Sequence, residues 1–239
     1  MAAALVGGHP GQAAPADEIP FTDQFFLEDC HLKSRGLNDY FIPLKPNCYL
    51  LLEGEDEGET VTLLIFVLPH TKVVDGVRCA VVRESEWAGD ELVEISWNYF
   101  SICRDTDSIF YHGEDVDIFE DDGVVHDGAW LAGQNGALPG LIMPGHPLNG
   151  SRYYQEIAPG VALDKAEHTS NTATVETPAG VFENCLTVVE TTDLEPGHES
   201  HKAYARGVGL IQDGVLKLVD YGCNPRLRDF EPGDGGGEE

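Results

Sequence analysis

The sequence contains no uncharged apolar run of the ~18 residues that a membrane-spanning helix needs. It is also short of positive charge: 14 Lys and Arg stand against 42 Asp and Glu, which gives a formal net charge of −28. A field of this sign repels phosphate backbones and anionic membrane surfaces, so nucleic acid is disfavoured as a partner. Cations and basic partners are favoured, although many of these carboxylates are also expected simply to keep the surface solvated.

No two cysteines form a C-x-x-C pair, which argues against a zinc ribbon or a thioredoxin-type redox site. The six are Cys30, Cys48, Cys79, Cys103, Cys185 and Cys223. Their number leaves open two or three disulfides, or a set of buried thiols. The N-terminal residues lack both the basic and the long apolar region of a signal peptide. We nevertheless expect an exported protein, extracellular or periplasmic, with at most two free thiols.

Both ends of the chain are too polar, or too rich in small residues, to pack into a core. Residues 1–20 are mostly Ala, Gly, Pro and polar residues, and the chain ends in a Gly- and Glu-rich stretch. We therefore predict a flexible N-terminal segment over 1–20, a single β domain over 21–222 and an acidic C-terminal tail over 223–239. The 239-residue length is sufficient for one sizeable β-rich domain.

From about Cys48 onward, the pattern is typical of antiparallel strands joined by tight turns. The run 61–68 is apolar except for one Thr, which predicts a strand buried on both faces. Asp122-Gly123 and Asp213-Gly214 predict hairpin tips, because Asp-Gly supplies the positive φ angles of a type I′ turn. Helical periodicity is weak, with one short helix expected over 21–29. The predicted strands cover residues 61–68, 77–87, 91–103, 109–121, 124–131, 151–157, 161–177, 181–192, 199–206, 208–212 and 215–221.

This pattern predicts an all-β fold: an antiparallel meander in a single domain, curved into an open barrel or clam, or split into two packed sheets. Residues 131–150 differ from the rest, because they are rich in Gly and Pro and have no strand pattern. A stretch of this kind is usually functional or packed as an Ω-loop.

Aromatic residues border this Gly-rich segment and predict a ligand site. Trp130, Tyr153 and Tyr154 offer broad apolar faces for a sugar or another small molecule, and Glu156 follows closely to fix its hydroxyl groups. The alternative is that these rings belong to the core of the barrel or sandwich.

The densest acidic run of the chain lies in the hairpin over 109–131 and predicts a cation site. Glu114, Asp115 and Asp117 are the candidate ligands, with Ca²⁺ as the candidate ion, because hard cations prefer several carboxylate oxygens. On a strand, Asp115 and Asp117 share one face and Glu114 lies on the other, so only a subset can converge. The alternative is a solvated outer face.

No local catalytic motif is present. The chain has no G-x-S-x-G elbow, and His198-Glu199-Ser200-His201 does not match H-E-x-x-H. Carboxyl pairs such as Glu156 with Asp164 or Glu114 offer acid–base chemistry of the kind that glycosidases use.

Several short motifs, in this order and spacing, resemble a family of exported bacterial β-rich proteins with no assigned activity. They include Phe41-Ile42-Pro43-Leu44-Lys45-Pro46, Tyr111-His112-Gly113-Glu114-Asp115, Gly128-Ala129-Trp130, Gly136-Ala137-Leu138-Pro139-Gly140, Leu194-Glu195-Pro196-Gly197 and residues 202–210. The resemblance spans about 40–221 and implies an extracytoplasmic β domain without transferring a mechanism. His112 departs from the family pattern, which argues against a shared ligand at that position.

Three classes of function remain open. The expected one is a non-catalytic binding or structural module that holds a small ligand or a cation near the Gly-rich loop 131–150 and the acidic hairpin 109–131. The first alternative is a secreted hydrolase that uses paired carboxylates or a metal. The second is a surface protein that self-associates by β-strand addition at its sheet edges.

Overall fold

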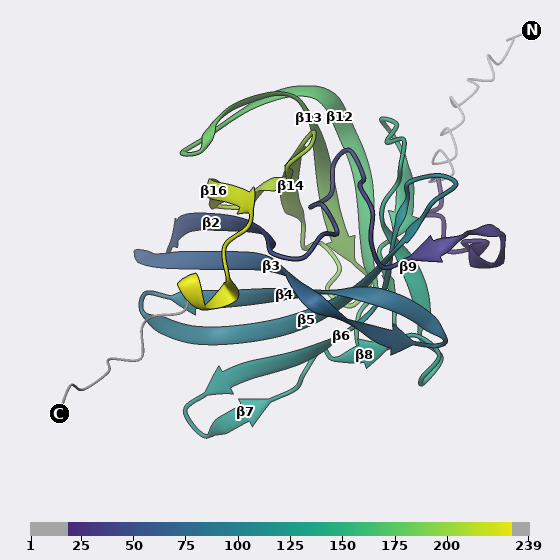
Figure 1. Cartoon of the computed structure of the whole chain (residues 1–239), viewed down its shortest axis with the longest axis horizontal. Coiled ribbons are helices and arrows are strands. Elements are labelled where there is room, and N and C mark those ends of the chain that lie inside the picture. The colour runs from purple at the N-terminus through teal and green to yellow at the C-terminus, as the bar shows by residue number, and fades with distance from the viewer. Residues whose placement is uncertain (1–18, 231–239) are drawn as a thin grey trace, which may run out of the picture.

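The computed structural model describes residues 19–230, so residues 1–18 of the predicted N-terminal segment and 231–239 of the predicted tail lie outside the described residues. Within that range, sixteen strands form one antiparallel, nearly closed barrel-shaped sheet (Figure 1). The all-β prediction is therefore confirmed. The strands are β1 (Leu32–Lys33), β2 (Cys48–Asp56), β3 (Glu59–Val74), β4 (Val77–Ala88), β5 (Glu91–Cys103), β6 (Ile109–Glu120), β7 (Gly123–Val125), β8 (Trp130–Leu131), β9 (Leu138–Met143), β10 (Arg152–Tyr154), β11 (Glu156–Ile157), β12 (Asp164–Thr177), β13 (Gly180–Thr192), β14 (Ser200–Ala205), β15 (Gly209–Asp213) and β16 (Leu216–Cys223).

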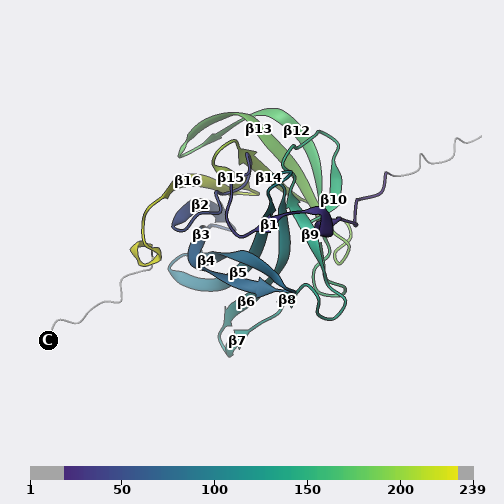
Figure 2. The same ribbon diagram turned by 45° about the vertical axis from the view of Figure 1, so that its right-hand side comes forward.

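The strand order runs β10-β12-β13-β14-β15-β16-β2-β3-β4-β5-β6-β9-β11. Its two ends, β10 and β11, are separated in sequence by Gln155 alone, so the chain itself crosses the seam of the barrel. The Gln155 backbone N–H donates to the Asp164 carbonyl oxygen (2.7 Å), and the Tyr154 N–H donates to that of Thr22 (2.9 Å). Figure 2 shows β9, β10 and β12 meeting at this seam. Residues at the seam are thus held between the two sheet edges.

The predicted hairpins form, each with its turn one residue away from the predicted place. Asp213 pairs with Leu216, so the turn is Gly214-Val215, one residue later than predicted. In the acidic hairpin, Glu120 pairs with Gly123, so the turn is Asp121-Asp122, one residue earlier than predicted. Further along, Trp130 pairs with Glu114, whereas counting back from a turn at Asp122-Gly123 would set it opposite Asp115. A one-residue slip moves a side chain to the other face of a sheet.

Strand β9 lies inside the segment 131–150, where the sequence predicted no strand. Pro139 and Gly140 interrupt the pattern, and both have a role at the seam: Pro139 pairs with Glu156, and a Cβ on Gly140 would lie 2.1 Å from the Gln155 carbonyl oxygen. Only glycine allows this approach of two backbones. The helix predicted over 21–29 is wrong, because that region holds only one 3-10 turn, η1 (Leu27–Asp29). The part of the chain that the structure describes has no helix long and apolar enough to cross a membrane.

The apolar core is continuous, and the run 63–68 is buried on both faces as predicted. Two disulfides staple the barrel. Cys30–Cys103 ties the segment before β1 to β5, and Cys48–Cys223 ties β2 to β16. The two remaining cysteines, Cys79 and Cys185, are free and buried. Two free thiols agree with the upper limit expected for an exported protein.

Candidate functional site

A cavity of about 140 Å³ lies inside the barrel, between an apolar wall and a polar wall. Cavities of about 150 Å³ accept a molecule the size of benzene. The apolar wall includes Phe41, Ile42, Leu50, Ile65, Val82 and Phe100. The polar wall consists of Glu84, Gln155, Glu156, Asp164, Glu190, Lys202, Tyr204 and Asp213. A cavity with both kinds of wall suits a small molecule that has an apolar body and a polar end.

Strand alternation places the polar wall inside the barrel. Side chains two residues apart on a strand share a face, so Lys202 and Tyr204 of β14 project inward together, as Val82 and Glu84 of β4 do. The register then sets Lys202 opposite Asp213 of β15. The polar wall is therefore assembled from inward positions on six strands, with two of them on β14, and from Gln155 at the seam.

Lys202 is the single cation of this wall, and its charge is already used. Its Nζ lies 2.8 Å from a Glu190 carboxylate oxygen and 3.3 Å from one of Asp213. Burial alone would lower the pKa of Lys202, but the Glu190 and Asp213 charges raise it above its ordinary value. The amide nitrogen of Gln155 also donates to Glu190 (2.8 Å). Lys202, Glu190 and Asp213 thus form one ion-paired group, in which a single ammonium group faces two carboxyl groups.

The other three acids of the wall have no such partner. Among residues 19–230, the side chains of Glu84, Glu156 and Asp164 make no hydrogen bond or ion pair. Burial raises the pKa of Glu84 to about 7. Burial, with the charges of Glu114 and Asp164, raises the pKa of Glu156 well above its ordinary value. Carboxyl groups inside a protein are normally paired or strongly hydrogen-bonded, so this side of the cavity holds three carboxyl groups without a direct partner among the described residues.

Two deeply buried side chains also present polar atoms without protein partners to the cavity. Tyr204 is only 6% exposed, and its hydroxyl group has no hydrogen bond within residues 19–230. Gln155 is 3% exposed, and its amide oxygen is likewise unpaired there. Most buried polar atoms in folded proteins have a partner. These two atoms mark the part of the cavity where a ligand can hydrogen-bond.

Of the four ligand residues predicted from the sequence, only Glu156 lines this cavity. Tyr153 is buried behind it, with its hydroxyl hydrogen-bonded to His168 Nε2 (2.8 Å). Tyr154 donates its hydroxyl proton to Asp193 (2.6 Å). Trp130 packs edge-on against Tyr111, with ring centroids 5.3 Å apart. It also lines a separate pocket of about 210 Å³, together with Glu114, Asp115 and residues of the Gly-rich segment. The structure therefore does not bring the three aromatic residues together around one cleft.

The three carboxylates of the predicted cation site also stay apart. Asp115 accepts hydrogen bonds from Lys72 Nζ (2.6 Å) and from the Tyr99 hydroxyl, and Asp117 pairs with His126 (2.9 Å). Glu114 lies on the other side of β6 and interacts with Tyr111. Nowhere in residues 19–230 do three His, Cys, Asp or Glu side chains come close enough to hold a metal ion.

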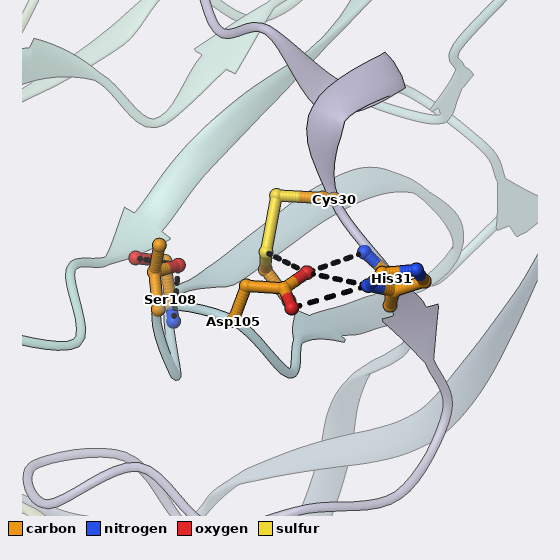
Figure 3. Close-up of polar contacts among 6 residues, drawn as sticks. Cys30, His31, Asp105 and Ser108 are labelled. Atoms are coloured by element: carbon orange, nitrogen blue, oxygen red, sulfur yellow. Dashed lines mark hydrogen bonds and ion pairs between the residues drawn. A yellow bond between two sulfur atoms is a disulfide. The ribbon is translucent and has the colours of Figure 1, made fainter.

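A histidine–carboxylate pair lies next to the Cys30–Cys103 disulfide. His31 Nδ1 is 2.9 Å from a carboxylate oxygen of Asp105, as a catalytic triad would require. Ser108, however, lies on the far side of Asp105 from the imidazole (Figure 3). Its hydroxyl oxygen accepts instead from Thr106 (3.0 Å) and from the Gly145 N–H (3.1 Å). These residues do not form a Ser-His-Asp triad.

No protein family, curated protein or solved structure matches the chain. The resemblance drawn from short motifs stays an expectation, and the chemistry of the cavity carries the functional argument. Sequence analysis missed Glu84, Glu190, Lys202 and Asp213. In a chain with 42 acidic residues, an inward carboxylate looks like its outward neighbours. The one available signal was Lys202, a rare cation two residues before an aromatic on a strand.

Proposed function

We propose that this protein is a non-catalytic binding module that holds a small organic molecule inside its barrel. The observation that carries the proposal is the cavity itself, to which the Tyr204 hydroxyl group and the Gln155 amide oxygen are presented without a protein partner among residues 19–230. A ligand that hydrogen-bonds to these two atoms would have its polar end oriented by them.

The size and the lining of the cavity define which ligand it can hold. The volume of about 140 Å³ accepts a body of about benzene size. Phe41 and Phe100, whose ring centroids lie 5.1 Å apart, give that body an aromatic surface. The polar end of the ligand would lie toward Tyr204 and Gln155. Burial of apolar area supplies binding free energy at about 25 cal/mol per Å², and the polar contacts fix orientation.

An extracellular or periplasmic location goes with this role. Two disulfides form between residues 73 and 175 positions apart, and such bonds persist in oxidising compartments. The strong negative charge keeps a secreted protein soluble. A binding module for small molecules fits that setting.

The rival function, a carboxylate hydrolase, has one observation in its favour. Glu114 and Glu156 both have raised pKa values, with burial as the largest cause and their mutual repulsion contributing to that of Glu156. A protonated carboxyl group can act as a general acid. A hydrolase would convert a bound ester or glycoside and lose that activity in Glu156→Gln, whereas a binding module returns its ligand unchanged.

Nuclear magnetic resonance (NMR) titration with benzyl alcohol, a benzene-sized body with one hydroxyl group, tests the proposal. We expect amide shifts confined to residues around the cavity. Tyr204→Phe should weaken binding by about fivefold, since one hydrogen bond is lost. Tyr221→Phe, at an exposed tyrosine of β16, is the matched control and should leave the affinity unchanged. If neither benzyl alcohol nor benzylamine shifts the cavity residues, the proposed function is rejected.

A further inference from the structure

We infer that the ligand is an organic cation, an ammonium group on a compact apolar body, received by Glu84, Glu156 and Asp164. This inference rests on the proposed binding function and specifies the chemistry of the ligand. It follows from which charges of the polar wall are already compensated and which are not.

The wall carries five carboxyl groups and one ammonium group. Lys202 is engaged with both Glu190 and Asp213, with contacts of 2.8 and 3.3 Å. The side-chain amide nitrogen of Gln155 also donates a hydrogen bond to Glu190. No other cation lines the cavity. An ammonium group brought by a ligand would supply the charge that the protein does not.

The three unpaired acids come from separate elements around the cavity. Glu84 is on β4, Glu156 begins β11 at the seam, and Asp164 begins β12. The hydrogen bond between the Gln155 N–H and the Asp164 carbonyl oxygen (2.7 Å) holds the last two strands side by side. An ammonium group has three N–H donors, so carboxyl groups on several sides of it are a matching set of acceptors.

Other polar wall groups and the aromatic rings favour the same head group. The unpaired atom of Gln155 is an acceptor, the amide oxygen, and the Tyr204 hydroxyl can also accept. Phe41 and Phe100 present rings to the cavity, and aromatic faces attract cations. A carboxylate or phosphate head group would meet several carboxyl groups and no free cation, because Lys202 is already engaged. A neutral hydroxyl would leave two or more acids unpaired.

Three probes of one size distinguish these head groups: benzylamine, benzyl alcohol and benzoate, measured by calorimetry and NMR at pH 7.5. We expect benzylamine to bind about tenfold or more tighter than benzyl alcohol, because hydrogen bonds to charged groups are the stronger ones. Benzoate should show no measurable binding. Equal affinity for the amine and the alcohol would overturn the cation inference and leave the proposed function standing. If none of the three binds, both are rejected.

Charge-removing variants then locate the head group. Glu84→Gln with Glu156→Gln should lower the affinity for benzylamine about tenfold and leave that for benzyl alcohol within about twofold. Glu55→Gln with Glu57→Gln removes the same charge from an exposed hairpin, and should change neither. Asp164→Asn alone is the second variant if the first pair does not fold. An equal loss of benzylamine affinity in the surface control would show that the effect is a long-range field effect. Competition by millimolar Ca²⁺ against benzylamine would show that the acids bind a metal ion instead. Either result contradicts an organic cation held by these acids.

Discussion

The acidic hairpin and the polar wall of the cavity are two negative regions with opposite chemistry. In the hairpin, Asp115 pairs with the Lys72 ammonium group and Asp117 with the His126 imidazole ring. In the wall, Glu84 and Glu156 form no direct ion pair within residues 19–230, and only the more distant charge of Lys202 acts on them. Exposed ion pairs of the first kind contribute about 0–1 kcal/mol, whereas a buried charge without a partner is costly. A high density of acids in the sequence therefore identifies the hairpin, whose acids already have partners. The absence of direct partners in the structure identifies the cavity wall as the candidate site.

Removing Lys202 should give the largest effect on this contrast. Lys202→Met leaves the partly buried carboxyl groups of Glu190 and Asp213 without a cation, which should lower the free energy of unfolding by about 1–3 kcal/mol at pH 7. Lys72→Met, the matched change at the hairpin, should cost about 1 kcal/mol or less. Urea denaturation of both variants measures this. Equal losses would show that the two regions do not differ.

Gly140→Ala tests the seam that positions Glu156. Its new Cβ would lie 2.1 Å from the Gln155 carbonyl oxygen, so β9 or the seam must move. We expect a loss of about 1–3 kcal/mol, as for overpacked sites, together with weaker benzylamine binding. Gly222→Ala, where the nearest atom is 3.3 Å away on the Tyr49 side chain, should cost much less. A seam that tolerates Gly140→Ala as well as Gly222→Ala would refute the close packing described here.

The pH dependence of stability should show a smaller effect of the cavity wall than the substitutions above. The folded pKa of Glu84, about 7, lies above its ordinary value of 4.5. The stability that protonated Glu84 adds to the folded state is therefore fully present below pH 4.5, and it is lost as the pH rises through 7. Burial lowers the pKa values of His112 and His168 to about 4, and their contribution is lost only as the pH falls from about 6.5 toward 4.

Thermal unfolding of the wild type and of Glu84→Gln between pH 6.5 and 8 isolates the Glu84 effect, because both proteins carry the same histidines. We expect the wild type to lose on the order of 1 kcal/mol more stability across this window than Glu84→Gln does. Glu55→Gln should keep the wild-type slope. A slope unchanged by Glu84→Gln would mean that this carboxyl titrates normally.

Much of the fold followed from local sequence patterns. Hairpins and long strands were predictable because alternation and turn residues act over a few positions, as in the run 61–68 and at Asp213-Gly214. Strand β9 was not predictable, because the positions of Pro139 and Gly140 reflect their contacts with residues 155 and 156 across the seam. Such contacts are set by the tertiary structure.

The site was less predictable than the fold. Glu156 was identified because it stands beside aromatic residues, although its partners in the wall are not those rings. Lys202 and Glu84 are marked only by facing inward, which depends on register and barrel closure. The slip that pairs Trp130 with Glu114 shows how one residue of register changes the neighbours of a side chain.

The most direct test follows the carboxyl carbon resonances of individual acids while benzylamine is added. We predict that the resonances of Glu84, Glu156 and Asp164 move and that the pKa values of Glu84 and Glu156 fall toward the ordinary range, because a bound ammonium group stabilises the ionised form. Asp115 and Asp117 should not respond. A response at the hairpin with none in the cavity, or amine binding that leaves all three wall acids unchanged, would contradict the account.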